Sequence, residues 1–222
     1  MKKMPLVLIV IISLFIFSIT LKNASAGSGV SGHRIIIDAG HGGSDPGTTQ
    51  CDGLYESDAN LKIANLLKAK LELSGATVYM TRTDASSLSN EDRYTYANST
   101  DGEVLVSIHL NGSTDHSVDG TTGLYAKRNK DKAFTTSLHK QLAADLGVKD
   151  LGITNFASGV ILKFNGPATI QETVYLSNTQ ECEALKNPDD VRSDEIAQSL
   201  FEGLNGWFSD PAAPIKPGKK PR

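Results

Sequence analysis

Short apolar runs alternate along the chain with longer segments of helical periodicity. The runs have the length and the β-branched composition of strands, and they cover residues 34–38, 77–81, 104–108, 123–126, 160–163 and 168–175. The longer segments place apolar residues every three or four positions, which predicts helices between Ser57 and Gly75 and over 89–98, 130–146 and 190–208. Strands that alternate with such helices predict one α/β domain with a mostly parallel sheet.

The N-terminal segment has the three parts of a secretory signal. A basic start is followed by an almost wholly apolar stretch over residues 5–21 and then by Ala24-Ser25-Ala26, with small residues at the positions that a signal peptidase recognises. We expect residues 1–26 to be a cleaved signal peptide. The alternative is a retained membrane anchor, because the apolar stretch is just long enough to span a bilayer.

The segments next to the predicted domain are polar and rich in small residues or proline. We expect residues 27–33 to form a flexible lead-in, with His33 facing solvent. Residues 209–222 are rich in proline and lysine and predict a disordered tail. The tail is interpreted as a solubilising end, with weak attraction to an anionic wall polymer as the alternative.

Composition and charge exclude several classes of protein. The 222 residues carry a net charge of −3, with 39% hydrophobic and 21% charged residues, which excludes disorder over most of the chain and argues against a nucleic-acid binder. Two cysteines are too few for a disulfide-scaffolded miniprotein or a four-cysteine zinc module. Outside the cell Cys51 and Cys182 are free to pair, but pairing needs Cα atoms within about 7 Å, and the sequence does not give that distance.

Four side chains with catalytic or metal-binding chemistry are placed at the ends of predicted elements. His41 and His109 each follow a predicted strand, and Glu172 lies within another. Ligands of an open parallel sheet bind at the carboxyl ends of its strands, so these side chains are expected at one edge. Glu56 stands just before the first long helix, where a carboxylate is favoured by the helix dipole.

Two imidazoles and one carboxylate form the ligand set of a catalytic zinc ion, and a further carboxylate can carry a proton during hydrolysis. Spacing alone leaves other interpretations open: the histidines can be loop or core residues, and Glu56 and Glu172 can be helix-cap or ion-paired carboxylates. His116 is an alternative ligand. Glu172 is the most unusual of these residues, because it shares a strand face with Ile170 and Val174, where an unpaired charge is costly.

Four sequence blocks carry a resemblance to a known family. They read IIIDAGHGGSDPGT, YESDANLKIANLLKAKLELSGATVYMTRTD, VLVSIHLNGS and PATIQETVYLSN, in this order along the chain. They resemble the zinc-dependent N-acetylmuramoyl-L-alanine amidases of the amidase 3 family, which are cell-wall hydrolases. The resemblance extends over residues 34–208, which are therefore expected to be the amidase catalytic domain.

The resemblance implies a roughly six-stranded mixed sheet flanked by helices, and one zinc ion per chain. The metal ligands would be His41, Glu56 and His109, and the catalytic residue would be Glu172. The substrate would be peptidoglycan, cut at the amide between N-acetylmuramic acid and L-Ala. We accordingly expect a secreted monomer of the cell wall or periplasm that contacts no nucleic acid, and the membrane only through its signal segment.

The sequence departs from the family pattern without losing any of these four residues. The segment after Asp150 lacks an arginine that many members have, Gln171 stands where valine is usual, and Leu110 replaces alanine. Asp38 and Asn111 are expected to orient the ligands from behind. Two rival functions remain: a zinc peptidase that cuts within stem peptides, and a wall-binding protein without activity.

Overall fold

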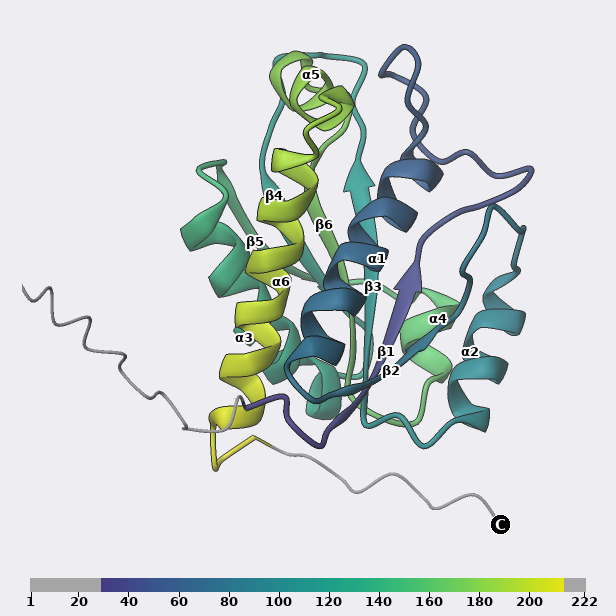
Figure 1. Ribbon diagram of the computed structural model, residues 1–222, viewed down its shortest axis with the longest axis vertical. Helices are drawn as coiled ribbons and strands as arrows, with labels where there is room; N and C mark the ends of the chain where they lie inside the picture. The colour runs from purple at the N-terminus through teal and green to yellow at the C-terminus, as the bar shows by residue number, and fades with distance from the viewer. Residues whose placement is uncertain (1–28, 214–222) are drawn as a thin grey trace, which may run out of the picture.

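The structure is a computed structural model that describes residues 29–213 (Figure 1). The expected signal peptide and the tail from residue 214 onward lie outside the described residues. Within residues 29–213, no helix combines the length and the apolar character that a membrane span needs.

Six strands form one sheet in the order β2-β1-β3-β6-β4-β5. The strands are β1 (Arg34–Ala39), β2 (Thr77–Met80), β3 (Val104–Asn111), β4 (Thr121–Tyr125), β5 (Asp150–Asn155) and β6 (Ala168–Tyr175). The four strands β2, β1, β3 and β6 are parallel, whereas β4 runs antiparallel to β6 and carries β5 alongside it. The prediction of an α/β domain with a mostly parallel, six-stranded mixed sheet is therefore confirmed.

Helices cover both faces of this sheet. Three long helices, α1 (Glu56–Leu73), α3 (Arg128–Asp145) and α6 (Val191–Ser209), pack on one face, in front of the sheet in Figure 1. The shorter α2 (Asn90–Ser99) and α4 (Gly159–Lys163) pack on the other face, and α5 (Thr179–Lys186) lies at one end of the sheet. Strand β1 is covered on both sides: Ile35 and Ile37 belong to the larger apolar core and Ile36 to the smaller one, and all three are fully buried.

The predicted strand over residues 160–163 is wrong, because this segment forms helix α4. Helical spacing buries Val160, Ile161 and Phe164 together against the smaller core and leaves Leu162 exposed. A strand would instead have placed Val160 and Leu162 on one face. A four-residue apolar run does not distinguish the two periods, so the packing of neighbouring residues decides the element.

The described part of the N-terminal lead-in packs against the domain. Val30 is fully buried, and the ring of His33 stacks on Phe208 with centroids 4.1 Å apart. Nδ1 of His33 lies 2.7 Å from a carboxylate oxygen of Glu103. The sequence predicted that His33 faces solvent. In the structure its ring is instead held between Phe208 and the Glu103 carboxylate.

A disulfide joins Cys51 to Cys182, with their Cα atoms 5.6 Å apart. It links the loop that leads into α1 to helix α5, across 131 residues of sequence. In the chain-entropy description, closing a loop of this size stabilises the folded state by about 5 kcal/mol. The bond therefore fixes a loop that ends five residues later at Glu56.

Candidate metal centre

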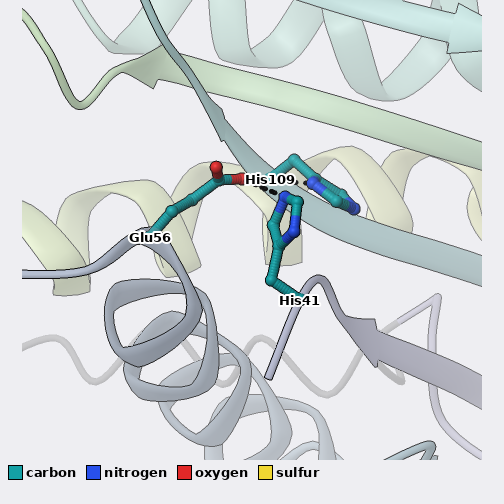
Figure 2. Close-up of side chains that lie close together, drawn as sticks. All are labelled: His41, Glu56 and His109. Atoms are coloured by element: carbon teal, nitrogen blue, oxygen red, sulfur yellow. Dashed lines mark hydrogen bonds and ion pairs between the residues drawn. The ribbon is translucent and has the colours of Figure 1, made fainter. Parts of the chain in front are cut away.

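Two histidines and one glutamate from three separate elements meet at the carboxyl edge of the sheet. His41 follows β1, His109 lies in β3, and Glu56 is the first residue of α1, with Tyr55 as the N-cap. Figure 2 shows both imidazole rings directed toward the Glu56 carboxylate. Three residues that are far apart in the sequence thus meet where the parallel strands end, as expected for a ligand site of an open sheet.

The distances within this cluster fit a small cation. Oε1 of Glu56 lies 3.2 Å from Nε2 of His41 and 3.1 Å from Nδ1 of His109, and the three ligand atoms are all within 4.8 Å of one another. Tetrahedral ligands 2.0–2.2 Å from a zinc ion are separated by about 3.4 Å. The nitrogen and oxygen donors are also the types that zinc prefers, so the residues present fit the ion.

The Glu56 carboxylate is buried and held in place by neighbouring donors. The backbone N–H of Thr48 donates to Oε2 at 2.8 Å, and that of Leu110 donates to Oε1 at 3.1 Å. The Asn60 amide also donates to Oε1. Burial alone would raise the pKa of Glu56, but the hydrogen bonds and charges of His109 and His41 outweigh it and hold the pKa far below its usual range. The group is therefore an anion at neutral pH, as a metal ligand must be.

Asp45 orients His41. Its Oδ2 lies 2.8 Å from Nδ1 of His41, which leaves Nε2 facing Glu56. Burial opposes a charge on the ring, yet Glu56 and Asp45 together raise the pKa of His41 to about 9. A carboxylate behind a ligating imidazole is the usual outer partner in metal sites.

The outer partners expected from the sequence do not occupy these positions. Asp38 is fully buried and accepts hydrogen bonds from Thr81, Ser107 and Arg93 rather than from a ligand. Asn111 lines the cavity beside the cluster, and its side-chain oxygen accepts from the backbone of Gly112. Asp45 was missed because it lies in a loop without periodicity, although its position four residues after His41 was a usable signal.

Glu172 lies beside His109 on the neighbouring strand. The two residues are paired in the β3–β6 register, directly before a shift in the pairing of the two strands. Burial raises the pKa of Glu172, and the charges of His109 and His41 only partly oppose this. Glu172 therefore lies beside the cluster with a pKa above the ordinary value of a carboxyl group.

Two cavities meet at the cluster. One, of about 630 Å³, is lined by polar loop residues together with the three clustered side chains and Glu172. The other, of about 610 Å³, is partly apolar, with Leu124, Phe156 and Ile170 among its lining residues. His41, His109, Asn111 and Glu172 line both cavities. A substrate that extends in two directions therefore has room on either side of the cluster.

His116 is not part of the cluster. Its Nδ1 lies 2.7 Å from the carbonyl oxygen of Ser177, and the residue lines a different cavity with Asp52 and Lys186. The alternative in which His116 replaces one of the two histidines therefore has no support in the geometry.

Gly47 separates the two ligand-bearing segments, and its replacement is expected to weaken metal binding. A Cβ added there would lie 2.4 Å from Oε2 of Glu56 and 2.7 Å from the His41 ring. Gly53 has a similarly positive φ, 82° against 67°, but nothing lies within 4 Å of its added Cβ. Alanine at either position costs about 1–2 kcal/mol of backbone strain.

Gly47→Ala should therefore weaken zinc binding in a competition titration against a chromophoric chelator, whereas Gly53→Ala should only lower the thermal unfolding temperature. Equal zinc affinities for the two variants would show that Gly47 does not need to be small for the centre to form.

The chain is similar to known proteins in sequence and in fold. The sequence profile of the family described as N-acetylmuramoyl-L-alanine amidase matches residues 35–205. The amidase LytC of Bacillus subtilis is 31% identical over 182 residues, which cover 81% of this chain and 36% of LytC. The probable cell wall amidase LytH of Staphylococcus saprophyticus is 32% identical over 179 residues, which cover 79% of this chain and 58% of LytH. The matched part of the chain thus spans between a third and three fifths of the length of these two relatives.

Solved structures show the same fold. The catalytic domain of CwlV, an N-acetylmuramoyl-L-alanine amidase from Bacillus (Paenibacillus) polymyxa, superposes with a TM-score of 0.74 at 31% identity, over 79% of this chain and 98% of that one. An N-acetylmuramoyl-L-alanine amidase from Clostridium difficile 630 gives a TM-score of 0.75 at 30% identity, over 81% of this chain and 98% of that one. With a family profile that matches most of its length and the fold of these enzymes, the chain belongs to the N-acetylmuramoyl-L-alanine amidase family.

Proposed function

We propose that the protein hydrolyses the amide bond between N-acetylmuramic acid and L-Ala in peptidoglycan, and that the reaction depends on one zinc ion per chain. His41, Glu56 and His109 would hold the ion, and Glu172 would be the catalytic residue. The observation that supports this most is the meeting of two imidazoles and a buried carboxylate, all within 4.8 Å, at a cavity that Glu172 also lines. Membership of the amidase family points to the same chemistry.

Different side chains of the protein would have different roles in the hydrolysis of the amide. When bound, a zinc ion supplies Lewis acidity and lowers the pKa of water at the site. Glu172 accepts a proton from the attacking water and passes it to the nitrogen of L-Ala as the C–N bond breaks. A new C–O bond forms on the lactyl carbonyl carbon, so the products are a lactyl carboxylate and a free amine. Asp45 keeps the His41 ring oriented throughout.

This function implies a location outside the cytoplasmic membrane, because peptidoglycan lies there. The basic and apolar start of the sequence fits export, and residues 1–26 are proposed to be the signal that directs it. A secreted monomer in the cell wall or periplasm, with residues 34–208 as the catalytic domain, is the arrangement we propose.

Product identity tests the function directly. Purified sacculi treated with the zinc-loaded protein should release peptides with free L-Ala amino termini and leave the glycan strands intact, as read by mass spectrometry. Chelation should abolish the release, and added zinc should restore it. New ends inside the stem peptides would instead identify a peptidase, and binding to sacculi without new ends would identify a wall-binding protein.

A further inference from the structure

Two buried arginines lie beneath the loop and helix that carry His41 and Glu56. Arg82 follows β2 and is 4% exposed, and Arg93 lies in α2 and is 5% exposed. A buried guanidinium is costly unless most of its donors are satisfied, so its hydrogen bonds show what it holds in place.

Arg82 donates to backbone carbonyls next to both ligands. Its Nε donates to Ala39 at 2.8 Å, and its Nη2 donates to Gly40 at 2.9 Å and to Ser57 at 2.7 Å. Gly40 directly precedes one proposed ligand, His41, and Ser57 directly follows the other, Glu56. One guanidinium group therefore bridges the two segments. Among residues 29–213, no carboxylate lies within ion-pair distance of it, so Arg82 is held by carbonyl oxygens instead.

Arg93 reaches the same loop from helix α2. Its Nη2 donates to the carbonyl of His41 at 2.7 Å, and its Nη1 donates to Ala39 at 2.8 Å and to the Asp38 carboxylate at 2.7 Å. Asp38 balances the charge of Arg93 in the buried layer. Three consecutive carbonyl groups, those of residues 39, 40 and 41, thus point at guanidinium donors.

These contacts fix the backbone of the loop that carries His41. On either side of His41, backbone hydrogen bonds hold the loop at Gly40, which donates to Ile108, and between Gly42 and Asp45. His41 lies between them with a φ of 60°, in the left-handed region that few residues other than glycine adopt. A guanidinium group offers five donors in a rigid plane, so it fixes the relative position of the carbonyls that it joins better than a flexible ammonium group does.

We infer that Arg82 is a positioning residue for the metal centre, which sets the separation of His41 and Glu56 by holding the carbonyls beside them, with Arg93 fixing the His41 carbonyl. The inference rests on the proposed metal centre. It predicts that zinc affinity depends on Arg82 although Arg82 touches neither ligand side chain. Outer partners of metal ligands typically change affinity by about 10–100-fold.

The test compares zinc affinity with fold stability in three variants. Arg82→Lys keeps the charge but loses the planar set of donors, and Arg82→Met removes both. The control is Arg34→Met, because Arg34 begins β1 at the end away from the ligands and donates to Asp101 and Glu103. Zinc affinity is measured by competition with a chromophoric chelator, and stability by thermal unfolding of the metal-free protein.

We expect Arg82→Lys to bind zinc at least tenfold more weakly than the parent protein. Arg34→Met should unfold at a lower temperature with unchanged zinc affinity. If Arg82→Met does not fold, Arg93→Lys takes its place, and this variant too should bind zinc more weakly than the parent protein. An Arg82→Lys variant that binds zinc as tightly as a zinc-binding parent overturns the inference and leaves the proposed function intact, whereas a parent protein that binds no zinc overturns both.

Discussion

Glu172→Gln is expected to keep the fold and the zinc ion and to lose at least about 100-fold in the rate of hydrolysis, the lower end of what proton transfer contributes. The amide has the shape of the carboxylate but cannot accept the proton of the attacking water. Its zinc affinity should change little, because the three proposed ligands are other residues. Rates on purified peptidoglycan and the zinc content of the same preparation are the two measurements.

A matched control for this variant is Glu181→Gln. Glu181 is 7% exposed, pairs with Arg192 at 2.6 Å, and lines neither of the two cavities at the candidate metal centre. The control should lose stability and keep activity. Near-normal turnover by Glu172→Gln would remove Glu172 from the mechanism, and equal losses in both variants would trace the effect to stability.

His109→Ala is expected to weaken zinc binding by more than about 100-fold and to abolish hydrolysis. The variant removes a proposed ligand, and the loss of an outer partner alone typically costs 10–100-fold. His116→Ala is the control, because His116 lies in the loop that follows β3 and hydrogen bonds to Ser177. Metal analysis after dialysis against a weak chelator distinguishes the two variants. Unchanged zinc stoichiometry in His109→Ala would show that the ligand is another residue.

Most of the sheet was predictable because its strands are buried runs. Residues 35–37 and 104–106 are apolar on both faces, which is typical of a parallel strand in a layer that is covered on both sides. Ser89 and Asp92 have the spacing of a capping box at the start of α2, and the structure has both of its hydrogen bonds. Sequence patterns succeed where one local rule and the overall packing agree.

The elements that escaped prediction lack such a pattern. Strand β5 is at the sheet edge and mostly exposed, and Leu151 and Ile153 are its only large apolar residues, so the alternation is too short to predict a strand. Helix α5 has only eight residues and a polar composition. Their positions depend on long-range contacts, such as the disulfide at Cys182, that no local window contains.

The candidate site also contains residues that could be predicted from the sequence and one that could not. His41 follows a strand, Glu56 begins a helix, and His109 and Glu172 lie on neighbouring strands, so their meeting followed from topology and from the family resemblance. The position of Arg82 could not be predicted, because it is a charged residue after an edge strand and nothing in the neighbouring sequence indicates burial. Its role became visible only through the carbonyl groups that surround it.

The bond between Cys51 and Cys182 encloses most of the domain in one covalent ring. A single proteolytic cut anywhere between these residues opens the ring without dividing the molecule, since the two fragments stay attached through sulfur. Loops such as the one at Asp115, which is exposed, lie inside the ring. A nicked chain thus keeps Glu56 and Glu172 in one covalent species even after the backbone between them has been broken.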